Sequence, residues 1–320
     1  MQRIRTQSSR LHRGVALITA LMVMSLATIT AVSMTAEQQI YFRRTENILL
    51  HEQTFLYLLS AEDFAKVALQ ADYRDGPTDS FKDTWAKSNA ENPQIFPIEG
   101  GILSGYIEDL QGKFNINNLA VTTGKVNKWD EDRLRKLLVI NGLSPDIANA
   151  IIDWLDPDDT ARFPDGAESV DYLQGEQPHR VGNGMMGSIS ELLYVKGIDY
   201  ESYQALSSVL VALPKTDVPI NINTASATVL QMLIDPLTES EAKDLQLDLA
   251  ENPLTEPQEL AAHPLVKGKK VDPNGISVES SYFLLRSYVE VGRAKDRMDS
   301  VIHRFNDKVI NVVVRSQGGL

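Results

Sequence analysis

The densest charge in the sequence lies in one short segment that runs from Asp153 to Asp171. Its only basic residue is Arg162, and Pro157 and Pro164 exclude a continuous helix there. Carboxylates this crowded repel one another unless a cation screens them, and a hard cation such as Ca²⁺ takes about six to eight oxygen ligands. The candidate metal ligands are the acidic side chains of this segment: Asp153, Asp156, Asp158, Asp159, Asp165, Glu168 and Asp171.

The residues of this segment alone leave two interpretations open. One is a calcium-binding loop, and the other is a solvated acidic loop that follows the C-terminus of a helix. An EF-hand is excluded, because the sixth position counted from Asp156 is Ala161, where that loop requires glycine.

The other residues with catalytic side chains do not form a recognisable motif. The histidines are dispersed and none lies in an H-E-x-x-H pattern, and the sequence has no cysteine, G-x-S-x-G or Walker loop. Gly182–Gly187 fits G-x-G-x-x-G, but no buried strand precedes it, so we interpret it as a loop. We therefore predict that the protein is not an enzyme.

The charge distribution argues against nucleic acid as a partner. The net charge of the chain is −12, and the first acidic residue is Glu37. The basic residues before it are Arg3, Arg5, Arg10 and Arg13, so the rest of the chain is more acidic than the whole. An acidic surface repels phosphate backbones and attracts cations.

The elements that must position these residues begin with a long apolar stretch near the N-terminus. No charged side chain occurs from Gly14 to Ala36, and Val15 to Val32 is mostly apolar. About 20 helical residues cross the hydrocarbon core of a bilayer. The arginines before this stretch and the acids after it predict an N-terminus in the cytoplasm. A cleaved signal peptide has a shorter apolar region, of about 7–15 residues.

The helical pattern continues without interruption beyond the apolar stretch. Neither glycine nor proline occurs from Val15 to Asp75, so one helix of about 90 Å is expected. In its second half, helical spacing places apolar and small residues on one face, opposite Glu62, Lys66 and Asp72. That face contains Leu56, Leu59, Ser60, Phe64, Val67, Ala68 and Ala71.

This N-terminus resembles that of type IV pilins and pseudopilins, in which a short basic leader ends in glycine before an apolar helix. The resemblance implies a processing site formed by Arg13, Gly14 and Val15, with cleavage after Gly14 by a prepilin peptidase and methylation of the new amine of Val15. Most members carry glutamate at the fifth mature position, which is Thr19 here. Its absence is typical of the K-class minor pseudopilins (GspK) of type II secretion systems, which lie at the pseudopilus tip.

The rest of the chain predicts an α+β fold with a helical insertion. Residues Ile102–Glu108 and Lys113–Ile116 indicate two strands around a turn, and the C-terminal runs Tyr282–Val291, Met298–Phe305 and Val309–Arg315 indicate an antiparallel meander. Helical segments are expected between them: Asp130–Asn141, Asp146–Trp154, Ser188–Val195, Tyr200–Ala212, Ala225–Ile234, Glu239–Leu249 and Glu256–Ala262. A long helix on an antiparallel sheet with an inserted all-α domain is also the K-class arrangement.

Five divisions of the chain follow from these patterns. They are a basic leader (1–14), the transmembrane part of the long helix (15–36), an amphipathic helix with the first strands (37–117), the inserted helical domain with the acidic loop (118–275), and the C-terminal strands (276–320).

Short phrases in the K-class order support the resemblance along nearly the whole chain. They are GKFNINNL, DWLDPDD, GAESVDYL, SISELLYVKGI and INTASATVL. The resemblance implies a structural Ca²⁺ in the helical domain, held best by Asp156, Asp158, Glu168 and Asp171, with Asp153, Asp159 and Asp165 as further candidates. It also implies the I-, J- and H-class minor pseudopilins and the major pseudopilin as partners.

We therefore expect a minor pseudopilin that is anchored in the inner membrane with its bulk in the periplasm. It would initiate or cap the pseudopilus that exports folded proteins across the outer membrane. The alternative is a bitopic inner-membrane protein whose periplasmic domain binds a metal or ligand and has no relation to filaments.

Overall fold

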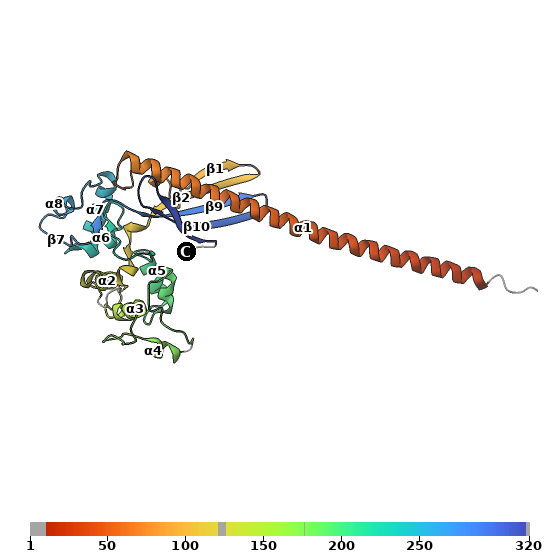
Figure 1. The fold of residues 1–320 in the computed structure, drawn as a ribbon, viewed down its shortest axis with the longest axis horizontal. Coiled ribbons are helices and arrows are strands. Elements are labelled where there is room, and N and C mark those ends of the chain that lie inside the picture. Colours follow the sequence, from red (N-terminus) through yellow and green to blue (C-terminus); the bar gives the residue numbers. More distant parts are fainter. Residues whose placement is uncertain (1–10, 121–125, 176, 318–320) are drawn as a thin grey trace, which may run out of the picture.

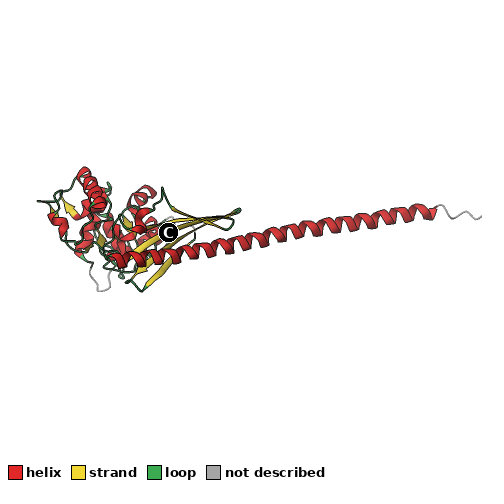
Figure 2. Ribbon diagram, turned by 90° about the horizontal axis from the view of Figure 1, so that it is seen from above, coloured by secondary structure: helices red, strands yellow, loops and turns green. Residues whose placement is uncertain are grey.

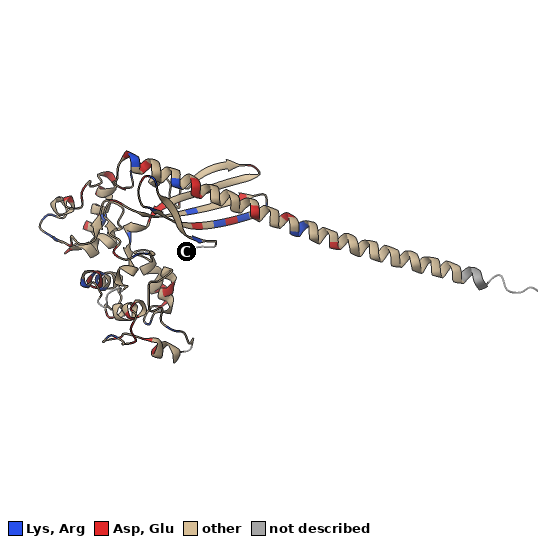
Figure 3. Cartoon of the chain, viewed as in Figure 1, with Lys and Arg blue, Asp and Glu red and all other residues tan. Residues whose placement is uncertain are grey.

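The computed structural model describes residues 11–120, 126–175 and 177–317, and it is dominated by one straight helix, α1 (Leu11–Asp75) (Figure 1). The first half of α1 projects alone, and the second half lies along a sheet (Figures 1 and 2). An 18-residue window within Val15–Asp75 has a mean hydropathy of 2.3, so this helix is long and apolar enough to cross a membrane. Figure 3 shows its projecting part almost free of charge.

The hydroxyl groups of the apolar half satisfy their hydrogen bonds within α1. Ser25 donates to the carbonyl oxygen of Leu21 at 2.8 Å, and Thr28 donates to that of Met24 at the same distance. Such back-bonding lowers the cost of placing a hydroxyl among lipid chains. The uninterrupted helix expected from the absence of glycine and proline is confirmed.

A five-stranded antiparallel sheet packs against the second half of α1, in the order β1-β2-β9-β10-β11. Its strands are β1 (Gln94–Ile98), β2 (Gly101–Asp109), β9 (Tyr282–Val291), β10 (Ala294–Arg304) and β11 (Ile310–Ser316). The C-terminal meander is therefore confirmed, and β1, with Pro97 at the sheet edge, was not predicted.

The register between β10 and β11 is irregular between Val301 and Ile302. Val312 consequently packs with Ile302 on the face that α1 covers, whereas Val314 packs with Val301 on the opposite face. In a regular strand, residues two apart would share a face. The irregularity lets β11 contribute apolar side chains to both sides of the sheet.

The face of α1 that packs on the sheet is not the one expected from the sequence. Its buried positions are Thr54, Leu58, Glu62, Ala65 and Leu69. Glu62 is 1% exposed because it accepts hydrogen bonds from Ser300 of β10 at 2.7 Å and Arg315 of β11 at 2.6 Å. Leu56, Phe64 and Val67, which belong to the apolar face given by helical spacing, are 62%, 57% and 62% exposed.

The inserted domain lies at the end of the sheet that is distant from the projecting helix (Figure 1). Its α-helices are α2 (Lys128–Ile140), α3 (Ile147–Leu155), α4 (Ser169–Leu173), α5 (Tyr200–Ser207), α6 (Ala227–Leu233), α7 (Glu239–Glu251) and α8 (Glu259–Ala262). The 3-10 turns are η1 (Thr84–Lys87), before β1, and η2 (Leu110–Gly112), η3 (Ile116–Leu119) and η4 (Ile189–Tyr194). Two-residue strands complete it: β3 (Phe114–Asn115), β4 (Leu210–Val211), β5 (Ile220–Asn221), β6 (Ile234–Asp235), β7 (Lys270–Val271) and β8 (Ile276–Ser277).

Local predictions in this domain need three corrections. The strand expected at Lys113–Ile116 does not return beside β2; β3 pairs in parallel with β4, almost 100 residues later. The helix expected over Tyr200–Ala212 ends at Ser207, and the segment expected as a helix at Ser188–Val195 is the 3-10 turn η4.

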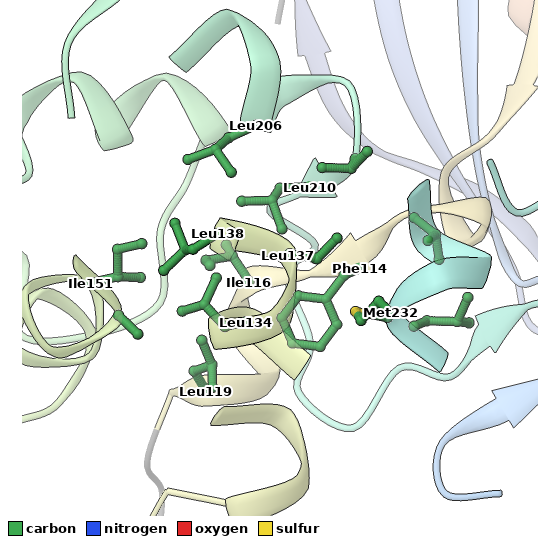
Figure 4. Packing of buried hydrophobic residues seen from close by; sticks show 14 of the residues in the cluster. Phe114, Ile116, Leu119, Leu134, Leu137, Leu138, Ile151, Leu206, Leu210 and Met232 are labelled. Carbon is green, nitrogen blue, oxygen red and sulfur yellow. The ribbon is translucent and has the colours of Figure 1, made fainter. Parts of the chain in front are cut away.

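The inserted domain has its own core, centred on Phe114 (Figure 4). The Phe114 ring is fully buried among Leu134 and Leu137 of α2 and Met232 of α6. The same core extends to Leu260 of α8, so segments from across the insertion fold around one interior. That interior fixes the position of α3, which carries the first residues of the acidic loop.

Candidate metal centre

The acidic loop begins at the last turn of α3 and ends at the first turn of α4. Asp153 is fully buried on α3, and its Oδ2 accepts the backbone N–H groups of Arg162 at 3.0 Å and Ala167 at 2.9 Å. The returning chain is also held by Asn149, whose amide donates to the carbonyl of Pro164 at 2.6 Å. These contacts fold the loop back over the end of α3.

The return of the loop requires glycine at position 166. A Cβ atom there would lie 2.3 Å from Oδ2 of Asp153 and 2.3 Å from the carbonyl oxygen of Arg162. Both distances are far shorter than any real carbon–oxygen contact, so a side chain would push the loop away from α3. Gly166 therefore allows Glu168 to approach the acids of the helix end.

Three carboxylates meet inside this loop. One oxygen from each of Asp156, Asp158 and Glu168 lies within 4.8 Å of the others, and Asp156 and Glu168 are buried. Oδ1 of Asp153, Oδ1 of Asp156 and both Glu168 oxygens are buried without a hydrogen-bond partner. An unpaired buried carboxylate is strongly unfavourable, so this set of oxygens fits a cation ligand shell.

The electrostatics of the loop indicate the same need for positive charge. Burial, followed by repulsion from Asp153 and Asp156, raises the pKa of Glu168 to about 7. Burial and repulsion from Asp158 raise the pKa of Asp156 to about 6. The only basic side chain of the loop, that of Arg162, keeps its Nε 3.8 Å from Asp153 and 4.0 Å from Asp156. Arg162 therefore compensates these charges only partly.

The other predicted ligands lie outside this cluster. Asp171 accepts the backbone N–H of Glu168 at 2.9 Å, which starts α4 and orients Glu168. Asp159 and Asp165 are exposed, and Asp165 adopts φ of 61° in the turn. The structure therefore brings Asp156, Asp158 and Glu168 together. Asp153 lies beside them on α3, and Asp171 lies outside the cluster, in the first turn of α4. The close approach at Gly166 was missed because nothing local in the sequence indicates it.

A second acidic group, which sequence reasoning also missed, contains Asp72, Asp79 and Asp83. It already holds an internal cation, because Nη2 of Arg304 lies 2.6 Å from both oxygens of Asp79 and Nη1 lies 3.2 Å from Asp72. The Arg304 side chain is 1% exposed. We interpret this group as a buried ion pair that ties the end of α1 to β10.

The residues singled out for processing lie at the start of α1. Arg13 and Gly14 belong to the helix, Val15 is 62% exposed, and the leader arginines Arg3, Arg5 and Arg10 lie outside the described residues. Thr19, where pilins usually have glutamate, donates its hydroxyl to the carbonyl of Ala16 at 3.0 Å.

Comparisons with known proteins agree on one family. The family described as type II secretion system (T2SS), protein K, matches residues 112–215 and 220–279. A type II secretion system protein K of Pseudomonas aeruginosa is 31% identical, over 97% of this chain and 94% of its own length. The corresponding protein of Aeromonas hydrophila is 29% identical, over 98% and 99%.

A solved structure agrees in fold. It is a chain of the GspK–GspI–GspJ complex from the type 2 secretion system of enterotoxigenic Escherichia coli, with a TM-score of 0.76 and 27% sequence identity. The match covers 86% of this chain and 99% of that one. Both the α+β fold and the sequence therefore identify a structural component of the secretion system: the chain belongs to the type II secretion system protein K family and is a minor pseudopilin.

Proposed function

We propose that this minor pseudopilin occupies the tip of the pseudopilus and caps it during assembly. The observation that carries this proposal is the position of the inserted domain, beyond the end of the sheet that is distant from the projecting helix (Figure 1). If α1 lies along the filament axis, a further subunit stacked above would collide with that domain. Thr19 supports the same position, since a subunit at the tip has no neighbour above it whose amine would need a carboxylate.

The partners would dock on an apolar stripe along the soluble half of α1. This stripe, made of Leu49, Leu56 and Val67, is 62–63% exposed and lies on the side of α1 opposite its buried positions. Positions seven and eleven residues apart share one side of a helix, which suits packing against another helix. We assign the I- and J-class minor pseudopilins to this stripe, within Phe42 to Ala71, because the similar solved chain comes from a GspK–GspI–GspJ complex. The H-class and major pseudopilins would occupy the next positions in the filament, further from the tip.

Co-purification tests this assignment. Leu56→Asp should abolish capture of the I- and J-class partners by the full-length protein, because a carboxylate cannot be desolvated in a helix–helix contact. Tyr200→Asp is the matched control, since Tyr200 of the inserted domain is 65% exposed and off the stripe. Equal partner capture by the two variants would contradict the assignment.

The N-terminal segment would be retained in the inner membrane, with the N-terminus in the cytoplasm and the bulk in the periplasm. We expect a prepilin peptidase to cleave after Gly14 and the new amine of Val15 to be methylated. Mass spectrometry of the protein from cells should therefore find N-methylated Val15 at the terminus. An intact Met1, or cleavage near Ala36, would instead favour the alternative of a protein unrelated to filaments.

The acidic loop would bind Ca²⁺ as a structural ion. The unpaired oxygens of Asp153, Asp156 and Glu168 support this assignment, and Asp158 can add an exposed ligand. The ion would neutralise the cluster and fix the loop between α3 and α4, which stabilises the inserted domain.

Calorimetric titration of the purified protein with Ca²⁺ tests this role. Heat and a higher melting temperature are expected for the natural protein and for Asp165→Asn, whose side chain is exposed outside the cluster. Both should be lost in Asp156→Asn. No heat from the natural protein would refute calcium binding.

A further inference from the structure

Four consecutive residues with large side chains encircle α1 just beyond its apolar part: Tyr41, Phe42, Arg43 and Arg44. Successive helical residues are rotated by about 100°, so four of them sweep most of the circumference. Tyr41 is 64% exposed and Phe42 is 74% exposed. Neither arginine has an ion-pair partner among the described residues. We name these four residues the collar.

If α1 is retained in the membrane, the length of its apolar part places the collar at the height of the lipid headgroups. The uncharged stretch from Gly14 to Ala36 is just long enough for the hydrocarbon core of about 30 Å. Tyr41 is five residues beyond Ala36, or about 7 Å along the helix. The headgroup layer extends about 5–7 Å beyond the core. Helical side chains lean toward the N-terminus, so those of the collar reach back toward the bilayer.

The soluble domain begins directly above the collar. Arg293, in the β9–β10 turn, donates to Glu46 at 2.8 Å, and Glu46 is only two residues beyond Arg44. The basic residues at this end of the β9–β10 hairpin are already neutralised, because Arg293 pairs with Glu46 and Lys295 pairs with Glu290 at 2.7 Å. Among the residues that the structure describes at this end of the sheet, the arginines of the collar are therefore the ones without an ion-pair partner.

We propose that the collar binds the anionic headgroups of the leaflet on the domain side and sets the depth of α1, with the base of the sheet resting on the membrane surface. Arginine pairs with phosphate through two N–H groups, and aromatic side chains concentrate at the membrane interface. A helical partner would contact a stripe of residues three or four apart, whereas the collar faces all sides, as a surrounding layer requires. This inference rests on the proposed retention of α1 in the membrane.

Site-directed spin labelling tests the depth, and the chain contains no cysteine that would interfere. Single cysteines are placed at positions 37–40 and 45–48 of the full-length protein in vesicles of phosphatidylethanolamine and phosphatidylglycerol. Immersion depth should fall steadily by about 1.5 Å per residue and cross the phosphate level between positions 40 and 45. A depth profile with a period of three to four residues, which signifies one-sided protein contact, would overturn the proposal.

The double variant Arg43→Ala/Arg44→Ala tests the charge. Each arginine near an anionic surface contributes about a fivefold preference for it, so removing both should lower that preference about 25-fold and change the depth of labels at 39 and 45. Lys66→Ala/Arg74→Ala removes equal charge far up the same helix and should leave the depths unchanged. Unchanged depths in the collar variant would refute the proposal. Resistance of the protein to alkaline extraction is measured in parallel, because it reports whether α1 is retained in the membrane. Loss of this resistance would show that the proposed retention has failed. Intact resistance with unchanged depths would show that only the collar proposal has failed.

Discussion

The stability effect of Glu168→Gln should change sign with calcium. In the calcium-free protein, burial and the neighbouring acids raise the pKa of Glu168 from 4.5 to about 7. The folded state then binds the Glu168 proton more tightly than the unfolded state does, so stability is lost as the pH rises from about 4.5 to 7. Each pKa unit corresponds to about 1.4 kcal/mol, and the loss at pH 7 is about 3 kcal/mol.

Glutamine removes this charge but leaves a buried amide without partners, which costs about 1–2 kcal/mol. Without calcium the variant should therefore be about 1–2 kcal/mol more stable than the natural protein. With calcium at 100 times its dissociation constant, the natural protein gains about 2.7 kcal/mol, and a variant with a weakened site gains little. The variant should then be about 1 kcal/mol less stable.

Urea titrations of the full-length protein in mild detergent, with chelator and with calcium, measure both differences. Fluorescence of Trp154 reports on this region, because its ring lies 5.8 Å from that of Tyr172 on α4. Asp165→Asn removes one charge from the same loop, at an exposed position with φ of 61° that asparagine tolerates, and should have little effect in either condition. The same sign for Glu168→Gln in both conditions would refute the reasoning.

Three further variants separate the other contacts. Arg304→Leu leaves Asp79 buried without its cation and should cost about 3–5 kcal/mol at pH 8 in urea unfolding. Burial already raises the pKa of Asp79 to about 7 against the opposing effect of Arg304, so this loss should shrink as the pH falls toward 6 and Asp79 is protonated. Gly166→Ala displaces the loop from Asp153 and should weaken calcium binding at least tenfold in calorimetry, with the helix content by circular dichroism unchanged. Leu56→Ser should leave the melting temperature within about 2 °C while partner capture falls, because Leu56 is 62% exposed.

The long helix and the meander could be predicted because their signals are local. The absence of glycine and proline extends through α1, and each strand of the meander contains β-branched or aromatic residues between turn residues. The buried face of α1 could not be predicted, because the partners that satisfy Glu62 are Ser300 and Arg315, more than 230 residues away. Local periodicity assigns a glutamate to the solvent, and only the assembled sheet shows that this one is paired.

The acidic loop could likewise be predicted only in part, because its composition is local but its path depends on tertiary contacts. Its composition was sufficient to predict a candidate cation site, and Asp156, Asp158 and Glu168 do meet there. Composition could not show that these three residues, rather than Asp165 or Asp171, form the cluster, because this depends on how the chain folds back over α3. Asp153 holds the returning chain by accepting hydrogen bonds from two backbone N–H groups. Gly166 permits this path, because a Cβ atom at that position would clash with Asp153.

The proposed tip position would require the inserted domain to be held rigidly on the sheet, and one buried carboxylate at their junction contributes to this. Oδ2 of Asp109, at the end of β2, accepts hydrogen bonds from Asn221 at 3.1 Å, Thr224 at 2.6 Å and Ser280 at 2.7 Å. Burial raises the pKa of Asp109, and these donors oppose that effect by stabilising its charged form. Because the three donors come from the returning segments of the insertion, the domain cannot rotate on the sheet without leaving a buried charge unpaired. A load applied to the helical domain would therefore pass through this junction to the sheet and to α1.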